Sequence, residues 1–129
     1  MDLGLKGKRV LVTGGSRGIG LEIAKHFLQE GSKVVVSSRG QEQLTQAETE
    51  LASEYGEENI LSCACDFTKA DDVNKLSEYI EKQCSGIDVV VANVGDGRSV
   101  SDPIPHQEQW QRMWNINFET GLNTARIFL

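Results

Sequence analysis

Residues 13–20 read Thr13-Gly14-Gly15-Ser16-Arg17-Gly18-Ile19-Gly20, a glycine-rich stretch between two different patterns. An apolar run at residues 10–12 precedes it and predicts a strand, and apolar residues at helical spacing follow it. Glycine lets the backbone of such a turn approach a bound pyrophosphate, and the helix behind it offers unpaired N–H groups and the positive end of its dipole. The sequence therefore predicts an anion-binding turn of the kind that holds a dinucleotide.

Short apolar runs and helical patterns alternate along the rest of the chain. We expect strands at residues 8–12, 33–37, 59–65 and 87–92, and helices at residues 18–30, 41–55, 70–84 and from 107 onward. Because the strands are apolar on both faces and helices separate them, they should form a parallel sheet covered on both sides. The predicted fold class is α/β, a doubly wound Rossmann-type parallel sheet with strand order 3-2-1-4.

Length and charge restrict the class of partner. With 129 residues the chain has the size of one domain, and its net charge of −6 opposes general binding to nucleic acid or to anionic membranes. The expected partner is a small molecule. The chain shows neither a signal peptide nor an apolar run approaching the ~20 residues of a membrane span, which predicts a cytoplasmic protein.

The cysteines and histidines do not suggest a metal site. Cys63 and Cys65 lie two residues apart, on one face of the third strand, and Cys84 is distant in sequence. All three are expected to be free thiols that are buried or half-buried. His26 and His106 belong to no catalytic constellation and are expected at the surface, and no cluster has the spacing of metal ligands.

The glycine turn matches the cofactor motif Thr-Gly-x-x-x-Gly-x-Gly, with Thr13, Gly14, Gly18 and Gly20 at the fixed positions. In this respect the chain resembles the short-chain dehydrogenase/reductase family. The resemblance covers nearly all of residues 1–129 but only the first half of the family domain, its N-terminal NAD(P)-binding Rossmann half. It implies cofactor binding by the turn residues Gly14, Ser16, Arg17, Gly18, Ile19 and Gly20.

A second resemblance follows the third expected strand. Asp66, with Phe67 beside it, matches the family aspartate that hydrogen-bonds the adenine amino group, so both residues are assigned to the cofactor site. The alternative is that Asp66 serves only as a helix N-cap or as a turn residue.

Two asparagine segments complete the resemblance. Asn93 and Gly95 match the Asn-Asn-Ala-Gly segment that lines the cofactor, whereas Ala92 and Val94 depart from it. Asn117 matches a member of the family's catalytic group, whose carbonyl and a helix irregularity hold a water in the proton relay. The alternative for Asn117 is a polar helix residue that bonds its own backbone.

The residues after the second strand indicate the choice of cofactor. An acidic residue there would bind the ribose 2′-hydroxyl of NAD, but this chain has Ser38 followed by Arg39. Arg17 in the glycine turn adds a second cation, as in NADP-preferring family members, and a guanidinium suits a phosphate. NADP(H) is the predicted cofactor, with NAD(H) possible; either arginine alone would be read as a solvated surface charge.

The family's proton donor, a tyrosine in Tyr-x-x-x-Lys, is absent. Tyr55 is followed four residues later by Asn59, and Tyr79 by Gln83. The last residues carry no helix stop, so we expect that the chain ends inside a helix and lacks the C-terminal catalytic half. The 129 residues alone should be inactive, and the parent protein is predicted to be an NADP(H)-dependent carbonyl reductase or alcohol dehydrogenase that forms a homo-oligomer.

Other functions remain as alternatives. A non-catalytic nucleotide-sensing domain would use the same turn. A chain that lacks the C-terminal catalytic half could also have no independent function. Phosphotransfer is poorly supported because the turn lacks Gly-Lys-Ser/Thr. The substrate stays unidentified, although Arg98, in the polar loop expected at residues 95–105, would suit an anionic group if it is not simply solvated.

Overall fold

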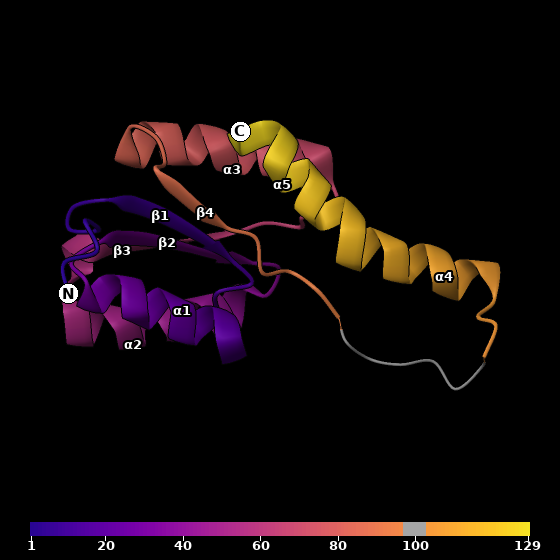
Figure 1. The fold of residues 1–129 in the computed structure, drawn as a ribbon, viewed down its shortest axis with the longest axis horizontal. Helices are drawn as coiled ribbons and strands as arrows, with labels where there is room; N and C mark the ends of the chain where they lie inside the picture. The colour runs from indigo at the N-terminus through magenta and orange to yellow at the C-terminus, as the bar shows by residue number, and fades with distance from the viewer. Residues whose placement is uncertain (97–102) are drawn as a thin grey trace.

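The computed structural model describes residues 1–96 and 103–129, and these form a four-stranded parallel sheet in the order β3-β2-β1-β4 (Figure 1). The predicted fold class and strand order are confirmed. The strands are β1 (Arg9–Thr13), β2 (Lys33–Ser38), β3 (Ile60–Ala64) and β4 (Val89–Val91). The helices are α1 (Gly18–Gln29), α2 (Gln41–Tyr55), η1 (Glu57–Asn59), α3 (Ala70–Cys84), α4 (Gln107–Trp114), η2 (Asn115–Glu119) and α5 (Thr120–Phe128).

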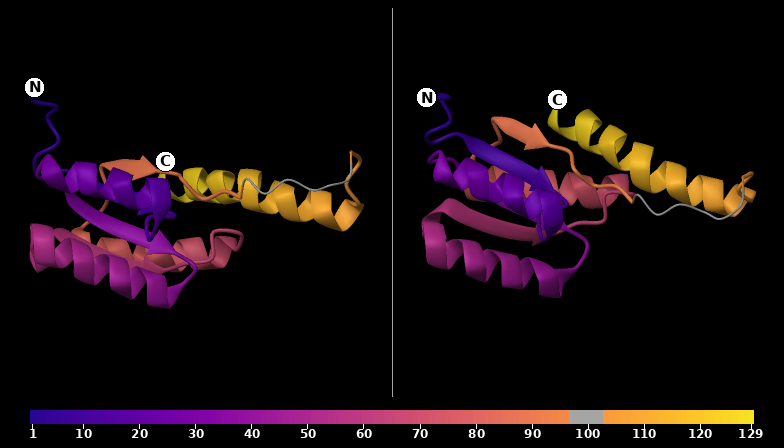
Figure 2. Two further views of the ribbon diagram at one scale, coloured as in Figure 1. Left: turned by 90° about the horizontal axis from the view of Figure 1, so that it is seen from below. Right: turned by 60° about the horizontal axis from the view of Figure 1, so that its bottom comes forward.

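Helices cover both faces of the sheet. Helices α1 and α2 lie on one face, and α3 and α5 lie on the other (Figures 1 and 2). Successive strand residues point to opposite faces, so Val10 and Val12 join the core under α1 and α2, whereas Leu11 joins the core under α3. This two-sided burial explains why the strands are apolar throughout.

Two elements differ from the expected ones. Strand β4 has three residues rather than six, and Asp88 just before it contacts the amino end of β1. The helix expected from residue 107 onward is interrupted by the π-helical segment η2, which contains Asn117. A helix irregularity at this asparagine agrees with what the family resemblance implied.

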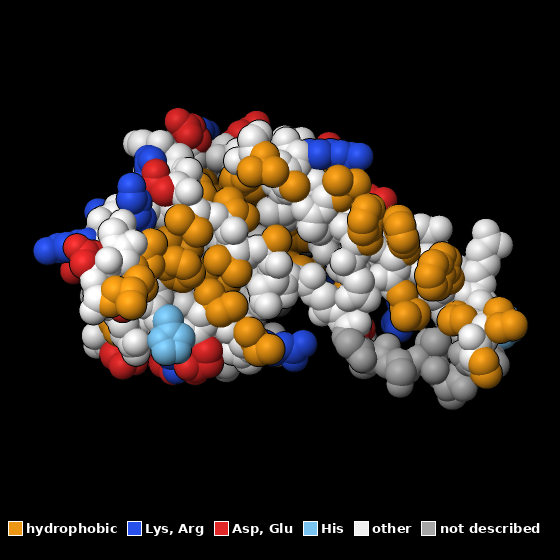
Figure 3. Space-filling view, in the orientation of Figure 1, with side chains coloured by type: hydrophobic (Ala, Val, Ile, Leu, Met, Phe, Trp, Pro, Cys, Tyr) orange, Lys and Arg blue, Asp and Glu red, His pale blue; other side chains and the backbone are white. Residues whose placement is uncertain are grey.

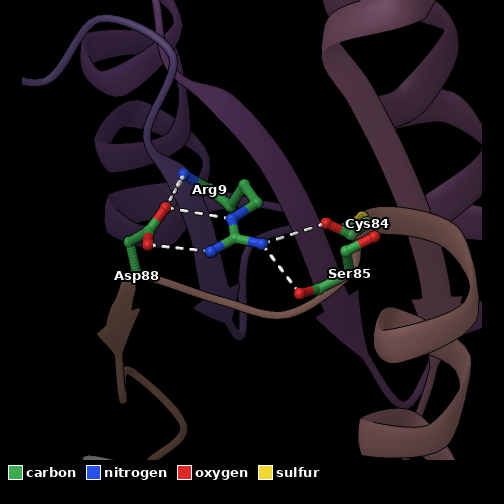
Figure 4. Close-up of polar contacts among 4 residues, drawn as sticks. All are labelled: Arg9, Cys84, Ser85 and Asp88. Carbon is green, nitrogen blue, oxygen red and sulfur yellow. Dashed lines mark hydrogen bonds and ion pairs between the residues drawn. The ribbon is translucent and has the colours of Figure 1, made fainter.

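Arg9 ties together the amino end of the sheet and the end of α3 (Figure 4). Its Nη2 and Nε donate to the two carboxylate oxygens of Asp88 at 2.9 and 3.0 Å, and its backbone N–H donates to Asp88 Oδ2 at 2.9 Å. Its Nη1 donates to the backbone oxygens of Cys84 and Ser85 at 3.2 and 2.8 Å. The guanidinium thus places β4 beside β1 and caps carbonyls at the end of α3.

The Arg9–Asp88 pair should make the stability of the protein depend on pH. Hydrogen bonds from Arg9 hold the pKa of the Asp88 carboxyl well below its usual range. A carboxyl whose pKa is lower in the folded than in the unfolded protein stabilises the fold at pH values above its unfolded-state pKa. This stabilisation is lost as the pH falls through the folded-state pKa. We expect Asp88→Asn to be less stable than the wild type at pH 7, with the difference shrinking as the pH falls below about 4. Urea unfolding of both proteins at pH 7 and at pH 3 measures this, and an equal difference at both pH values would contradict it.

Among residues 1–96 and 103–129, no helix has the length and apolar character that crossing a membrane requires.

Candidate functional site

The glycine turn is held in close contact with its neighbours. Gly14 has a φ of +65°, a region that glycine adopts without strain, and its N–H donates to Ser37 O of β2 at 2.7 Å. A Cβ on Gly14 would lie 3.0 Å from Asn93 O, and a Cβ on Gly20 would lie 2.1 Å from Gly14 O. Glycine is therefore needed at both positions by this backbone packing.

A chain of hydrogen bonds joins the glycine turn to the segment after β4. Thr13 Oγ1 donates to Val91 O at 3.3 Å and accepts from the Asn93 N–H at 2.9 Å. The Asn93 Nδ2 group in turn faces Gly14 O at 3.4 Å. In the order β3-β2-β1-β4, the crevice between β1 and β4 is where ligands of doubly wound sheets bind. Asn93 is therefore used to shape that crevice.

A cavity of about 830 Å³ opens at this carboxyl edge of the sheet. Its volume lies in the range of ligand-binding clefts. The predicted residues that line it are Gly14, Ser16, Arg17, Gly18, Ser38, Arg39, Asp66, Phe67, Asn93 and Gly95. Gly20, Ile19 and Asn117 are not part of the lining; Ile19 is 74% exposed and points to solvent.

Two arginines line the cavity. Arg17 and Arg39 are both exposed, and neither forms an ion pair within the part of the chain that the structure describes. The Ser38 hydroxyl, which lines the same cavity, donates to Ser16 Oγ at 3.0 Å. Gln43 of α2 also lines the cavity; sequence reasoning missed it because nothing in the strand pattern marks a helix residue there.

Asp66 lies in a turn that also faces the cavity. Its Oδ1 accepts from the backbone N–H of Thr68 at 3.0 Å and from the Thr68 hydroxyl at 2.5 Å. These bonds, the hydroxyl first, lower the pKa of the Asp66 carboxyl, so it is a charged acceptor at neutral pH. The N-cap of α3 is Lys69, so Asp66 is not an N-cap. Asp66 forms a turn with Thr68 and also lines the cavity, and its role toward a cofactor stays a prediction.

The part of the cavity wall beside Asp66 is apolar. Phe67 is 3% exposed and Cys65 is 4% exposed, and both belong to the core under α3. Burial raises the pKa of the Cys65 thiol to about 12, so this cysteine is not a thiolate at neutral pH. All three cysteines are free, as expected.

Asn117 holds the segment after β4 instead of bonding its own helix. Its Oδ1 accepts from the Asp96 N–H at 2.8 Å, and a Cβ on Gly95 would come within 3.1 Å of the same oxygen. Ile116 and Thr120, which flank Asn117, line the cavity. Sequence reasoning missed these two, although their spacing of four residues places them on one helix face.

The other candidates lie away from the cavity lining. The Tyr55 hydroxyl accepts from Gln29 Nε2 at 3.2 Å, and Tyr79 packs against the core under α3. His26 and His106 are exposed. Arg98 lies outside the described residues. Within residues 1–96 and 103–129, no group of three or more His, Cys, Asp or Glu side chains could hold a metal ion.

Comparison with known sequences gives relatives over the whole chain. The family profile described as short chain dehydrogenase matches residues 8–129. The uncharacterized oxidoreductase YvrD of Bacillus subtilis is 38% identical over 134 aligned residues, which cover all of this chain and 48% of YvrD. The chlorophyll(ide) b reductase NOL of Oryza sativa subsp. japonica is 35% identical over 74% of this chain and 28% of NOL. The chain thus spans about half the length of YvrD and less of NOL.

Solved structures share the fold. The L-sorbose reductase of Gluconobacter frateurii, complexed with NADPH and L-sorbose, matches with a TM-score of 0.91 and 31% identity over 99% of this chain and 48% of that one. An NADPH-bound short chain oxidoreductase of Pseudomonas aeruginosa PAO1, which contains an atypical catalytic center, matches with a TM-score of 0.89 and 28% identity over 94% of this chain and 47% of that one. The profile match over residues 8–129, together with this shared fold, shows that the chain belongs to the short chain dehydrogenase family.

Proposed function

We propose that this chain is the dinucleotide-binding half of an NADP(H)-dependent oxidoreductase that acts on a small carbonyl or hydroxyl substrate. The observation that carries the proposal is the cavity at the β1–β4 crevice, which has the glycine turn in its wall and is also lined by Arg17 and Arg39, neither of them in an ion pair within residues 1–96 and 103–129. The NADPH complexes of the G. frateurii and P. aeruginosa relatives support it.

In this proposal, the predicted residues would contact successive parts of a dinucleotide. The turn backbone at Gly14, Ser16 and Gly18, which line the cavity, would hold the pyrophosphate. Ile19 and Gly20 lie outside the lining and would contribute backbone groups alone, the Ile19 side chain being 74% exposed. In the same proposal, Ser38, Arg17 and Arg39 hold the ribose 2′-phosphate. The adenine would lie against Asp66 and Phe67, with its amino group donating to the Asp66 carboxylate. Asn93 and Gly95 would line the nicotinamide end.

Hydride transfer would come from the nicotinamide, so the protein must supply orientation and a proton. We propose Asn117 as a member of the catalytic group, through its backbone carbonyl in the π-helical segment η2. Its side chain is already used to hold Asp96. Neither Tyr55 nor Tyr79 lines the cavity, so residues 1–129 offer no tyrosine as a proton donor there.

Nucleotide titration tests this function. We expect the chain to bind NADPH more tightly than NADH, and to show no turnover of carbonyl substrates with NADPH. Protein fluorescence and calorimetric titration measure the first, and NADPH absorbance measures the second. Absence of binding to either dinucleotide would contradict the cofactor assignment, and turnover by a preparation free of longer protein would contradict the missing proton donor.

A non-catalytic nucleotide-sensing domain is the second candidate. The observation in its favour is that neither of the chain's two tyrosines lines the cavity. A Tyr-x-x-x-Lys segment encoded downstream of these residues in the same gene would exclude it.

We also propose a cytoplasmic homo-oligomer. The three free cysteines support a reducing compartment.

Trp110, Trp114 and Phe118 follow at intervals of four residues on α4 and η2, and are 56%, 41% and 47% exposed. Trp114 and Phe118 stack with ring centroids 4.4 Å apart. Apolar side chains gather over this arm of the molecule (Figure 3), which extends beyond the sheet (Figure 1).

The exposed rings of Trp110, Trp114 and Phe118 should favour self-association of the chain. Burying such aromatic rings stabilises an interface, because each removes a large apolar area from water. We expect the chain to self-associate, and the double variant Trp110→Glu/Trp114→Glu to shift it toward monomer. Analytical ultracentrifugation over a range of concentrations measures this. A stable wild-type monomer with cooperative unfolding would contradict the prediction.

A further inference from the structure

Asn123 on α5 carries a buried side chain that reaches outside its own helix. It is 8% exposed, and its Nδ2 donates to the backbone oxygen of Phe67 at 3.0 Å. The neighbouring Thr124 is also buried, but its hydroxyl donates to Thr120 O within the helix. Asn123 therefore links α5 to the turn after β3, a contact that joins residues 56 positions apart.

The oxygen that Asn123 holds belongs to the same peptide group as the Thr68 N–H. That N–H donates to Asp66 Oδ1 at 3.0 Å. Because a peptide group is planar, the direction of its C=O also fixes the direction of its N–H. The Asn123 amide at one end and the Asp66 carboxylate at the other thus hold one rigid unit between them.

The orientation of the Asp66 carboxylate follows from this arrangement. Oδ1 takes both hydrogen bonds from Thr68, and within the described residues Oδ2 receives none. Asp66 lines the cavity, so Oδ2 is the oxygen left for a ligand donor. Without the Asn123 donor, the buried Phe67 oxygen would be unsatisfied, and the peptide group would turn to find another partner.

We propose that Asn123 is a positioning residue for adenine recognition: by holding the Phe67–Thr68 peptide group, it aims the Asp66 carboxylate at the adenine amino group. The proposal rests on the proposed function, since it assumes that Asp66 accepts from that amino group. Asn123 itself does not line the cavity, so any effect on the nucleotide passes through the peptide group.

The test compares NADPH with its hypoxanthine analogue, in which an oxygen replaces the adenine amino group. We expect the wild-type protein to bind NADPH more tightly than the analogue by about tenfold or more, the size of a hydrogen bond to a charged acceptor. Asn123→Leu, which keeps the branched shape and the number of heavy atoms but donates nothing, should reduce this ratio to within about threefold of unity. A general loss of folded protein lowers both affinities equally and leaves the ratio unchanged.

Matched variants sharpen the result. Thr124→Val removes a buried hydrogen bond from the same helix without touching the turn, and should keep the wild-type ratio. Asp66→Asn should abolish the preference, and adding Asn123→Leu to it should change the ratio no further. If Asn123→Leu does not fold, Asn123→Ala, which leaves space but adds no bulk, is measured in its place.

The outcomes separate the inference from the function on which it rests. An unchanged ratio in the folded Asn123 variant, with a clear wild-type preference, would overturn the inference alone. A wild-type protein that binds NADPH without discriminating against the analogue would overturn the role of Asp66, and the inference with it. A protein that binds neither nucleotide would overturn the proposed function as a whole.

Discussion

Replacing Gly20 by alanine is expected to destabilise the protein and to abolish dinucleotide binding. The added Cβ would lie 2.1 Å from Gly14 O and 2.7 Å from Asn93 Nδ2. The first contact is with backbone, so it cannot be relieved by a side-chain rotation, and α1 must move away from the turn. Because overpacking of this kind costs about 3 kcal/mol, the loss is a large part of the stability of a small domain.

Urea denaturation measures the free energy of unfolding, and NADPH titration measures the loss of binding. Gly121→Ala provides the control. A Cβ at Gly121 would meet nothing within 4 Å, and the residue lies in α5. Alanine favours a helix by up to about 1 kcal/mol over glycine. Gly121→Ala should therefore be at least as stable as the wild type. Equal stability of Gly20→Ala and the wild type would show that the close approach of α1 to the turn is not needed.

Replacing Arg39 by aspartate is expected to reverse the cofactor preference from NADPH to NADH. Arg39 lines the cavity and follows Ser38 directly, and no carboxylate stands at the end of β2. The substitution removes a charge-assisted contact to a 2′-phosphate and offers an acceptor to a 2′-hydroxyl. Together these effects should change the ratio of the two affinities by about a hundredfold or more.

Titration of both dinucleotides against the variant measures this ratio. Arg112→Asp makes the same change of charge on the exposed side of α4, outside the cavity lining, and should leave the preference unchanged. If Arg39→Asp still prefers NADPH, the residue at position 39 does not contact the 2′-group of the ribose. A preference lost equally in both variants would instead indicate a long-range effect of net charge.

The local patterns of the sequence were sufficient for the architecture. The two-sided apolar runs predicted the parallel sheet, because a strand buried on both faces must be apolar at every position. The glycine turn predicted the place of the cavity, because the strand before it, its glycines and the helix after it can all be recognised in one short stretch of sequence. The strand order then brought the turn and the segment after β4 to one edge. The family match confirmed this reading over residues 8–129.

Tertiary structure alone decided which polar groups meet. Arg9 pairs with Asp88, 79 residues away, and Asn123 with Phe67, 56 residues away. Asn117 bonds Asp96 rather than its own helix, and Gln43, Ile116 and Thr120 line the cavity without any motif. Periodicity and turn chemistry describe how a residue relates to its near neighbours. A hydrogen bond between distant elements depends on ångström-level placement that only the packed sheet and helices provide, because its strength falls steeply with distance and angle.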